Sequence, residues 1–180
     1  MLNSNQINAV LKRLDEVLLD QGVDPVVLRV CGGGALLVLG IVSRQTRDLD
    51  VVTPKLTEEL ITGSRKVAVE FSLPLDWLNN GPENLVKDLN LGWEDRCQLI
   101  YSGRNLRIFA LGREDLIASK LYAYCDREES DLEDLLKIKP THDELNALYR
   151  WLLERDASLH WPTRVESKWK KLLKRLGYEK

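Results

Sequence analysis

The stretch that decides the fold is residues 32–52, GGGALLVLGIVSRQTRDLDVV. It begins with a glycine turn after an apolar segment and continues as a short apolar helix. It ends in a second apolar strand that opens with Asp48, Leu49 and Asp50. Because side chains alternate between the faces of a strand, Asp48 and Asp50 are predicted to project from one face while Leu49 points to the other. Two neighbouring carboxylates repel each other unless a cation lies between them or they share a proton.

The glycine turn and the aspartate pair together predict a site for metal-assisted handling of a phosphate. A helix N-terminus offers unpaired N–H groups and a partial positive charge, and glycine lets an anion approach the backbone. Two carboxylates suit Mg²⁺, which also takes waters and phosphate oxygens as ligands. We therefore expect Gly32 and Gly33 to bind the phosphates of an NTP, and Asp48 and Asp50 to bind Mg²⁺, in nucleotidyl transfer.

Other phosphate motifs do not fit this stretch. A P-loop, GxxxxGKS or GxxxxGKT, does not occur, and residues 32–37 lack the third glycine of the dinucleotide fingerprint. One alternative stays open, in which the glycines form only a tight turn and the aspartates are solvated at the strand end. Arg44 and Thr46, between the two motifs, are candidates to contact the triphosphate, although an exposed loop arginine can equally be solvated.

Composition sets the broad class. At 180 residues, 44% of them apolar, the chain has enough length for one domain, or one domain with an appendage. It has no apolar run of about 18 residues, so no membrane span is expected. The first residues do not resemble a secretory signal, and the three cysteines lack CxxC spacing, which predicts reduced thiols in a cytoplasmic protein. The net charge of −2 gives no general attraction to nucleic acid.

Hydrophobic periodicity predicts an α+β fold with a small mixed β-sheet rather than a doubly wound one, because the strands are few. We expect helices at residues 7–18, 35–39 and 57–71, strands at 26–31 and 48–52, and a β-hairpin of 97–101 and 106–110. Residues 72–82 are expected to be irregular. An α/β core is thus predicted over residues 1–111 and a helical region over 112–180, which can pack together as one domain.

Two capping-box patterns and a proline divide the helical region. Ser130 and Thr141 each precede a glutamate by three residues, so each is predicted to begin a helix. Pro162 is predicted to start a last helix with an apolar stripe and basic residues on its other faces. Those basic residues either are only solvated or guide a tRNA or other RNA acceptor, and the sequence does not separate the two.

On these residues the chain resembles the DNA-polymerase-β-type nucleotidyltransferase superfamily. Its first motif is similar to the glycine turn, the apolar helix and the R-x-T-x-D-x-D pattern of residues 44–50. The resemblance is closest to small bacterial nucleotidyltransferase-like proteins related to the abortive-infection type IV toxins. It continues through residues 73–79 (LPLDWLN) and 113–123 (REDLIASKLYA) and covers most of 26–140.

The resemblance implies roles for individual residues. In that superfamily the aspartate pair binds metal ions, the turn holds phosphates and a helical lysine contacts the nucleotide, which implies this last role for Lys120. Two features depart from the family pattern. Many active members have Gly-Ser where this chain has Gly33-Gly34, and the usual third carboxylate is missing from residues 106–110, which leaves Asp131 or Asp134 as candidates to replace it.

The sequence therefore predicts an Mg²⁺-dependent nucleotidyltransferase that moves a nucleoside monophosphate from an NTP to a hydroxyl of RNA or protein. Asp48, Asp50 and Lys120 are the predicted catalytic residues, and Gly32, Gly33, Arg44 and Thr46 the predicted nucleotide-binding residues. One alternative is a catalytically inactive module of the same fold that binds a nucleotide or a partner. Another is the toxin of a toxin–antitoxin pair, which would bind an antitoxin protein.

Overall fold

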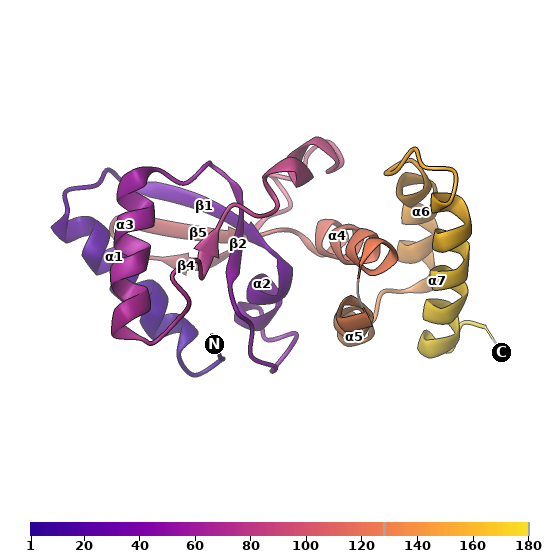
Figure 1. The fold of residues 1–180 in the computed structure, drawn as a ribbon, viewed down its shortest axis with the longest axis horizontal. Coiled ribbons are helices and arrows are strands. Elements are labelled where there is room, and N and C mark those ends of the chain that lie inside the picture. Colours follow the sequence, from indigo (N-terminus) through magenta and orange to yellow (C-terminus); the bar gives the residue numbers. More distant parts are fainter. Residues whose placement is uncertain (128, 180) are drawn as a thin grey trace. The chain divides into compact units, whose positions relative to one another are not determined.

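The computed structural model describes residues 1–127 and 129–179. It divides into two compact units, Met1–Gly112 and Arg113–Lys180 (Figure 1). The first contains a β-sheet with helices and the second contains helices. This mixed architecture confirms the predicted α+β class with helices at the C-terminal end.

The first unit is built on a five-stranded mixed sheet with the strand order β3-β2-β1-β5-β4. The strands are β1 (Val26–Cys31), β2 (Leu49–Thr53), β3 (Leu78–Asn79), β4 (Gln98–Ser102) and β5 (Leu106–Ala110). β1 is antiparallel to β2 and parallel to β5. β4 pairs with β5 as the predicted antiparallel hairpin. β1 is therefore the central strand, and it joins segments from both ends of the unit.

The helices of this unit are α1 (Ile7–Asp20), α2 (Gly32–Val38), α3 (Glu58–Glu70) and a 3₁₀ turn, η1 (Glu83–Lys87). α1 buries its apolar stripe and ends before Gly22, whose φ of 67° suits only glycine well. The side chain of Thr57 accepts a hydrogen bond from the Leu60 N–H and caps α3. α1 and α3 pack against each other, and Arg13 of α1 binds Glu70 of α3 at 2.7 Å (Figure 1).

Two local predictions for this unit need correction. The predicted helix at 35–39 is present, but it begins earlier, at Gly32, and ends at Val38, because the chain turns directly from β1 into α2. Residues 72–82 are not wholly irregular, since Leu78 and Asn79 form β3 beside β2. The Trp77 side chain just before them is fully buried and donates a hydrogen bond to the carbonyl of Ser64, which holds the segment against α3.

The second unit contains α4 (Arg113–Asp126), α5 (Glu129–Ile138), α6 (His142–Leu153) and α7 (Trp161–Leu176). Thr141 and Glu144 form the predicted capping box of α6, and Pro162 lies in the first turn of α7. The predicted cap at Ser130 was wrong, because α5 already begins at Glu129 and Ser130 lies inside it.

Several contacts fix these helices to one another. Arg113 donates to the carbonyls of Ile138 and Lys139 at the end of α5 and binds Glu144 of α6 at 2.7 Å. Trp161 is buried and donates its indole N–H to the carbonyl of Leu152. α7 is amphipathic as predicted, with Val165, Leu172 and Leu173 buried.

Within the described residues, every helix is too short or too polar to cross a membrane. The three cysteines are free thiols, as predicted. Burial raises the pKa of the Cys125 thiol to about 12, so this side chain is protonated at neutral pH.

Candidate functional site

The glycine turn and Asp50 meet where β1 ends. In the antiparallel pairing of β1 with β2, Cys31 is the partner of Asp50, so the next residue, Gly32, lies beside the Asp50 carboxylate. A β-carbon built on Gly32 would collide with Oδ2 of Asp50, and the φ of Gly32 is 72°. Glycine is therefore required at position 32 for two reasons, the backbone conformation and the closeness of the acid.

Arg44 and Thr46 lie around the second glycine of the turn. A β-carbon built on Gly33 would be 3.2 Å from Nη2 of Arg44 and 3.2 Å from Oγ1 of Thr46. Thr46 is buried, and its backbone pairs with Leu2 in an isolated β-bridge, whereas Arg44 is exposed. The structure thus brings together six of the seven predicted residues in or around the turn: Gly32, Gly33, Arg44, Thr46, Asp50 and, one residue before β2, Asp48.

The third glycine, Gly34, allows the turn to pack closely on the aspartate segment. A β-carbon on Gly34 would lie 2.6 Å from the carbonyl oxygen of Asp48 and 2.8 Å from Cδ1 of Leu49. A serine at this position, as in the Gly-Ser pattern of many superfamily members, would overlap with these atoms. The glycine here is thus matched to the short distance between α2 and the start of β2.

The alternation predicted for the aspartate strand agrees with the burial of its residues. Leu49 is fully buried, whereas Asp48 and Asp50 on either side of it are half-buried. Val51 is fully buried again. The two acids are therefore accessible at the end of a strand whose apolar residues anchor it in the core.

The residues on the other side of Asp50 were not among the predicted site residues. β3 runs parallel to β2, and Asn79 is the partner of Asp50 in that pairing. Gly81 follows, and a β-carbon built on it would lie 3.6 Å from Oδ1 of Asp50. The LPLDWLN block, which contributed to the family resemblance, was the only signal in the sequence that pointed to this segment.

Lys120 belongs to the second unit and has carboxylate partners there. Its Nζ lies 2.7 Å from Oδ1 of Asp131 and 2.7 Å from Oδ2 of Asp134, and Lys120 is only 7% exposed. Burial lowers the pKa of Lys120, but the charges and hydrogen bonds of Asp131 and Asp134 together outweigh it, so that the pKa is raised. The lysine and both candidate third acids thus form one buried ion cluster, which we call the Lys120 cluster.

The donor set at the glycine turn fits a hard cation such as Mg²⁺. Asp48 and Asp50 carry carboxylate oxygens, and two glycines, Gly32 and Gly81, lie beside the Asp50 carboxylate. Across residues 1–127 and 129–179, no group of three or more His, Cys, Asp or Glu side chains is placed to hold a metal ion. A cation here would therefore take its remaining ligands from water and from the phosphates of a substrate.

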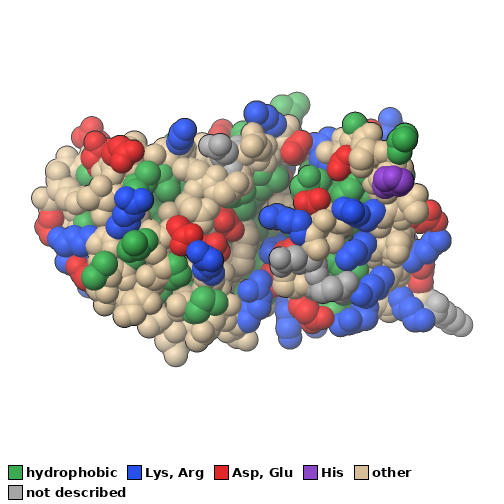
Figure 2. Space-filling view, viewed as in Figure 1, with side chains coloured by type: hydrophobic (Ala, Val, Ile, Leu, Met, Phe, Trp, Pro, Cys, Tyr) green, Lys and Arg blue, Asp and Glu red, His purple; other side chains and the backbone are tan. Residues whose placement is uncertain are grey.

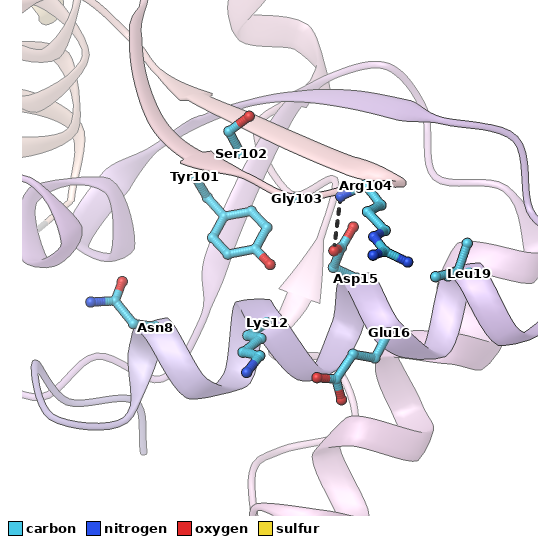
Figure 3. Close-up of a pocket in the computed structure, with 9 residues that line it drawn as sticks. All are labelled: Asn8, Lys12, Asp15, Glu16, Leu19, Tyr101, Ser102, Gly103 and Arg104. Carbon is cyan, nitrogen blue, oxygen red and sulfur yellow. Dashed lines mark hydrogen bonds between the residues drawn. The ribbon is translucent and has the colours of Figure 1, made fainter.

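A cavity of the first unit lies elsewhere, between α1 and the β4–β5 hairpin (Figure 3). Its volume is about 730 Å³, and none of the predicted site residues lines it. The ring of Tyr101 points toward α1, and the carboxylate of Asp15 points back toward the hairpin (Figure 3). Asp15 accepts hydrogen bonds from the backbone N–H groups of Arg104 and Asn105, at 3.0 and 2.7 Å, so its carboxylate has a structural role.

We expect Gly32→Ala to disrupt the turn although it adds only one methyl group. The new β-carbon would push the Asp50 carboxylate aside and would also strain a backbone with positive φ, so the free energy of unfolding should fall by about 1–3 kcal/mol. Urea denaturation of the variant measures this. Gly40→Ala is the matched control, because Gly40 also has positive φ but has open space around its α-carbon. A similar loss of unfolding free energy in Gly32→Ala and Gly40→Ala would contradict the contact with Asp50.

Comparison with known proteins identifies the family. No curated protein and no solved structure matches the chain. A family model described as "Nucleotidyltransferase of unknown function (DUF6036)" matches residues 5–174, which include the glycine turn, the aspartate pair and the Lys120 cluster. The chain therefore belongs to this family of nucleotidyltransferases, as its resemblance to the superfamily led us to expect.

Proposed function

We propose that this protein is an Mg²⁺-dependent nucleotidyltransferase that uses an NTP as donor and a hydroxyl group as acceptor. In this reaction a bond forms between the acceptor oxygen and the α-phosphorus, the bond to the β-phosphate oxygen breaks, and pyrophosphate leaves with the electron pair. The acceptor hydroxyl gives up its proton to solvent water. Mg²⁺ held by Asp48 and Asp50 would supply positive charge against the phosphates.

The residues around the turn have distinct roles in this proposal. The backbone N–H groups at the start of α2 donate hydrogen bonds to phosphate oxygens, and Gly33 adds no side chain to this first turn, whereas the Asp50 carboxylate lies directly against Gly32. Arg44, exposed beside Gly33, donates N–H groups from its guanidinium to the triphosphate. The hydroxyl of Thr46 also lies near Gly33, 3.2 Å from the position that a β-carbon would occupy, and it donates a hydrogen bond to the carbonyl of Asp48 at 3.4 Å.

One observation carries the proposal: the contact between the turn and the acid. Gly32 has no space for a β-carbon because the Asp50 carboxylate fills it. The phosphate-binding turn and the metal-binding acid would otherwise be two unrelated features of the sequence, eighteen residues apart by their numbers. Their direct contact supports a single site in which a bound cation and a bound phosphate touch.

Isothermal titration with each of the four NTPs in the presence of MgCl₂ tests the site. We expect Asp48→Asn and Asp50→Asn to weaken NTP binding by about tenfold or more, because the amides keep the shape but remove the charge that holds the cation. Asp24→Asn is the control, since Asp24 is an exposed acid in the turn before β1. Equal NTP affinity in all three variants and the wild type would contradict the site.

The acceptor is proposed to be RNA or protein, and α7 bears on this choice. It carries six basic residues and one acidic residue between Trp161 and Leu176. Figure 2 shows Lys and Arg side chains gathered on the visible face of the second unit. Lys170 pairs with Glu166 and Arg175 with Glu133, so part of this charge is neutralised within the protein. The excess of basic over acidic residues in α7 is consistent with a polyanionic acceptor such as tRNA.

Two alternatives stay predictions. A catalytically inactive module would bind NTP and Mg²⁺ in the titration above yet transfer no label from an α-³²P-labelled NTP to cellular RNA or protein. The lack of a third acid beside the aspartate pair among the described residues favours this alternative. A toxin would stop growth when expressed, and a co-expressed antitoxin or Asp50→Ala would restore it.

A further inference from the structure

Strand β3 brings an amide side chain next to the proposed metal-binding acid. Adjacent strands of a sheet lie about 4.8 Å apart, and partner residues project their side chains from the same face. Asn79 is the partner of Asp50 in the parallel pairing of β3 with β2. Its amide therefore lies beside the Asp50 carboxylate. Oδ1 of Asn79 and Oδ1 of Asp50 both lie within 4 Å of the position that a β-carbon of Gly81 would occupy.

The neighbouring residue, Asn80, holds this segment firmly on β2. Its Nδ2 donates to the carbonyls of Val51 and Pro54, at 3.0 and 3.1 Å, and its Oδ1 accepts from the N–H of Leu56 at 2.7 Å. The single side chain of Asn80 thus makes hydrogen bonds to three backbone groups, none of which belongs to Asp48 or Asp50. The position of Asn79 is consequently fixed by the fold and does not depend on a ligand.

The side chain of Asn79 is also fixed. Its Oδ1 accepts a hydrogen bond from the N–H of Gly81 at 2.6 Å, whereas its Nδ2 donates only a long one, 3.3 Å, to the carbonyl of Asp76. An aspartate has the same shape and would keep the Gly81 hydrogen bond. Its second oxygen would replace the weakly bonded Nδ2 and would add a negative charge beside Asp50.

We propose that Asn79 sets the affinity of the site for divalent cations, because its neutral amide occupies the place from which a third carboxylate would act on the ion held by Asp48 and Asp50. This inference rests on the proposed function. A neutral residue here leaves the site with two negative charges and makes binding of the cation depend more strongly on the phosphates of the NTP. The cation alone then binds weakly but measurably, and it binds more tightly when the nucleotide is also bound.

A titration with Mn²⁺ in the absence of nucleotide tests this inference, with the EPR signal of the free ion as the readout. We expect Asn79→Asp to bind Mn²⁺ about tenfold more tightly than the wild type, because one more negative charge then lies beside Asp50. We expect Asn79→Lys to weaken Mn²⁺ binding by a similar factor. Asn8→Asp is the charge-matched control, since it adds the same charge on the exposed surface of α1.

Asp50→Asn separates a failure of this inference from a failure of the proposed function. If Asp50→Asn binds Mn²⁺ as the wild type does, the proposed metal site is wrong. If Asp50→Asn loses Mn²⁺ but Asn79→Asp and Asn79→Lys both match the wild type, the metal site stands and the role of Asn79 is wrong. Equal tightening in Asn79→Asp and Asn8→Asp would also contradict it. Circular dichroism shows whether each variant is folded. If one of Asn79→Asp and Asn79→Lys does not fold, Mn²⁺ binding by the other variant decides the role of Asn79.

Discussion

Replacing Asp50 by asparagine is expected to lower kcat/KM for nucleotidyl transfer by about 10³-fold or more. The loss is large because the variant removes the charge that holds the cation, and charge stabilisation by a cation contributes several kcal/mol to such a transition state. The contact with Gly32 keeps the amide in the position of the carboxylate, so the fold should not change. Transfer from an α-³²P-labelled NTP to total cellular RNA and protein measures the effect.

The control for this experiment is Asp24→Asn, which should transfer label at the wild-type rate. Equal thermal melting of Asp50→Asn and the wild type would show that the lost activity has a chemical origin. If Asp50→Asn retained more than about a tenth of the wild-type rate, then Asp50 would not hold the catalytic cation. If the wild type itself bound NTP but transferred no label to either class of acceptor, then the inactive-module alternative would apply.

The Lys120 cluster is expected to produce the largest change in stability. Lys120→Met leaves Asp131 and Asp134 close together without their cation, and removal of one partner from a buried ion pair lowers the free energy of unfolding by about 3–5 kcal/mol. Lys120→Met combined with Asp131→Asn and Asp134→Asn should regain much of that loss, because no charge is then left unpaired. Lys137→Met, at an exposed position of α5, is the control. Urea denaturation measures all three.

The same cluster gives a pH dependence whose sign follows from the raised pKa of Lys120. The pKa of Lys120 in the folded protein lies above its ordinary value of 10.5. The contribution of Lys120 to stability is therefore complete below pH 10.5, and it is lost as the pH rises through the pKa of the folded state. Near neutral pH the cluster is therefore fully formed.

If Lys120→Met were as stable as Lys137→Met, the cluster would not hold the second unit together. The predicted nucleotide contact of Lys120 would then be the better reason for a lysine at this position.

The parts of the fold that follow from the sequence are those with a strong local pattern. α1 repeats apolar residues at helical spacing, and the β4–β5 hairpin has two short apolar strands around a glycine turn. β3 could not be predicted, because two residues are too few to show an alternation. It exists because Trp77 is buried and Asn80 binds the end of β2, and both are tertiary contacts.

The candidate site likewise has one part that the sequence predicts and another part that depends on tertiary contacts. Residues 32–50 form one continuous segment, so the meeting of glycines and aspartates could be inferred from a strand, a turn and a second strand. Asn79 and Gly81 reach Asp50 only through the parallel pairing of β3 with β2, which nothing in the sequence encodes locally. Likewise, Lys120, Asp131 and Asp134 each fitted a functional role when read singly. Their direct ion pairing depends on how α4 packs against α5.

The hydrogen bonds between the Asp15 carboxylate and the β4–β5 hairpin affect how this chain folds during synthesis. This carboxylate on the first helix binds the backbone of residues 104 and 105, and central β1 pairs with β5, so most of the unit must be synthesised before either contact can close. Such high contact order slows folding and leaves the nascent N-terminal half with an unsatisfied strand edge on the ribosome. Truncation before β5 should therefore yield an aggregating fragment rather than a smaller folded unit.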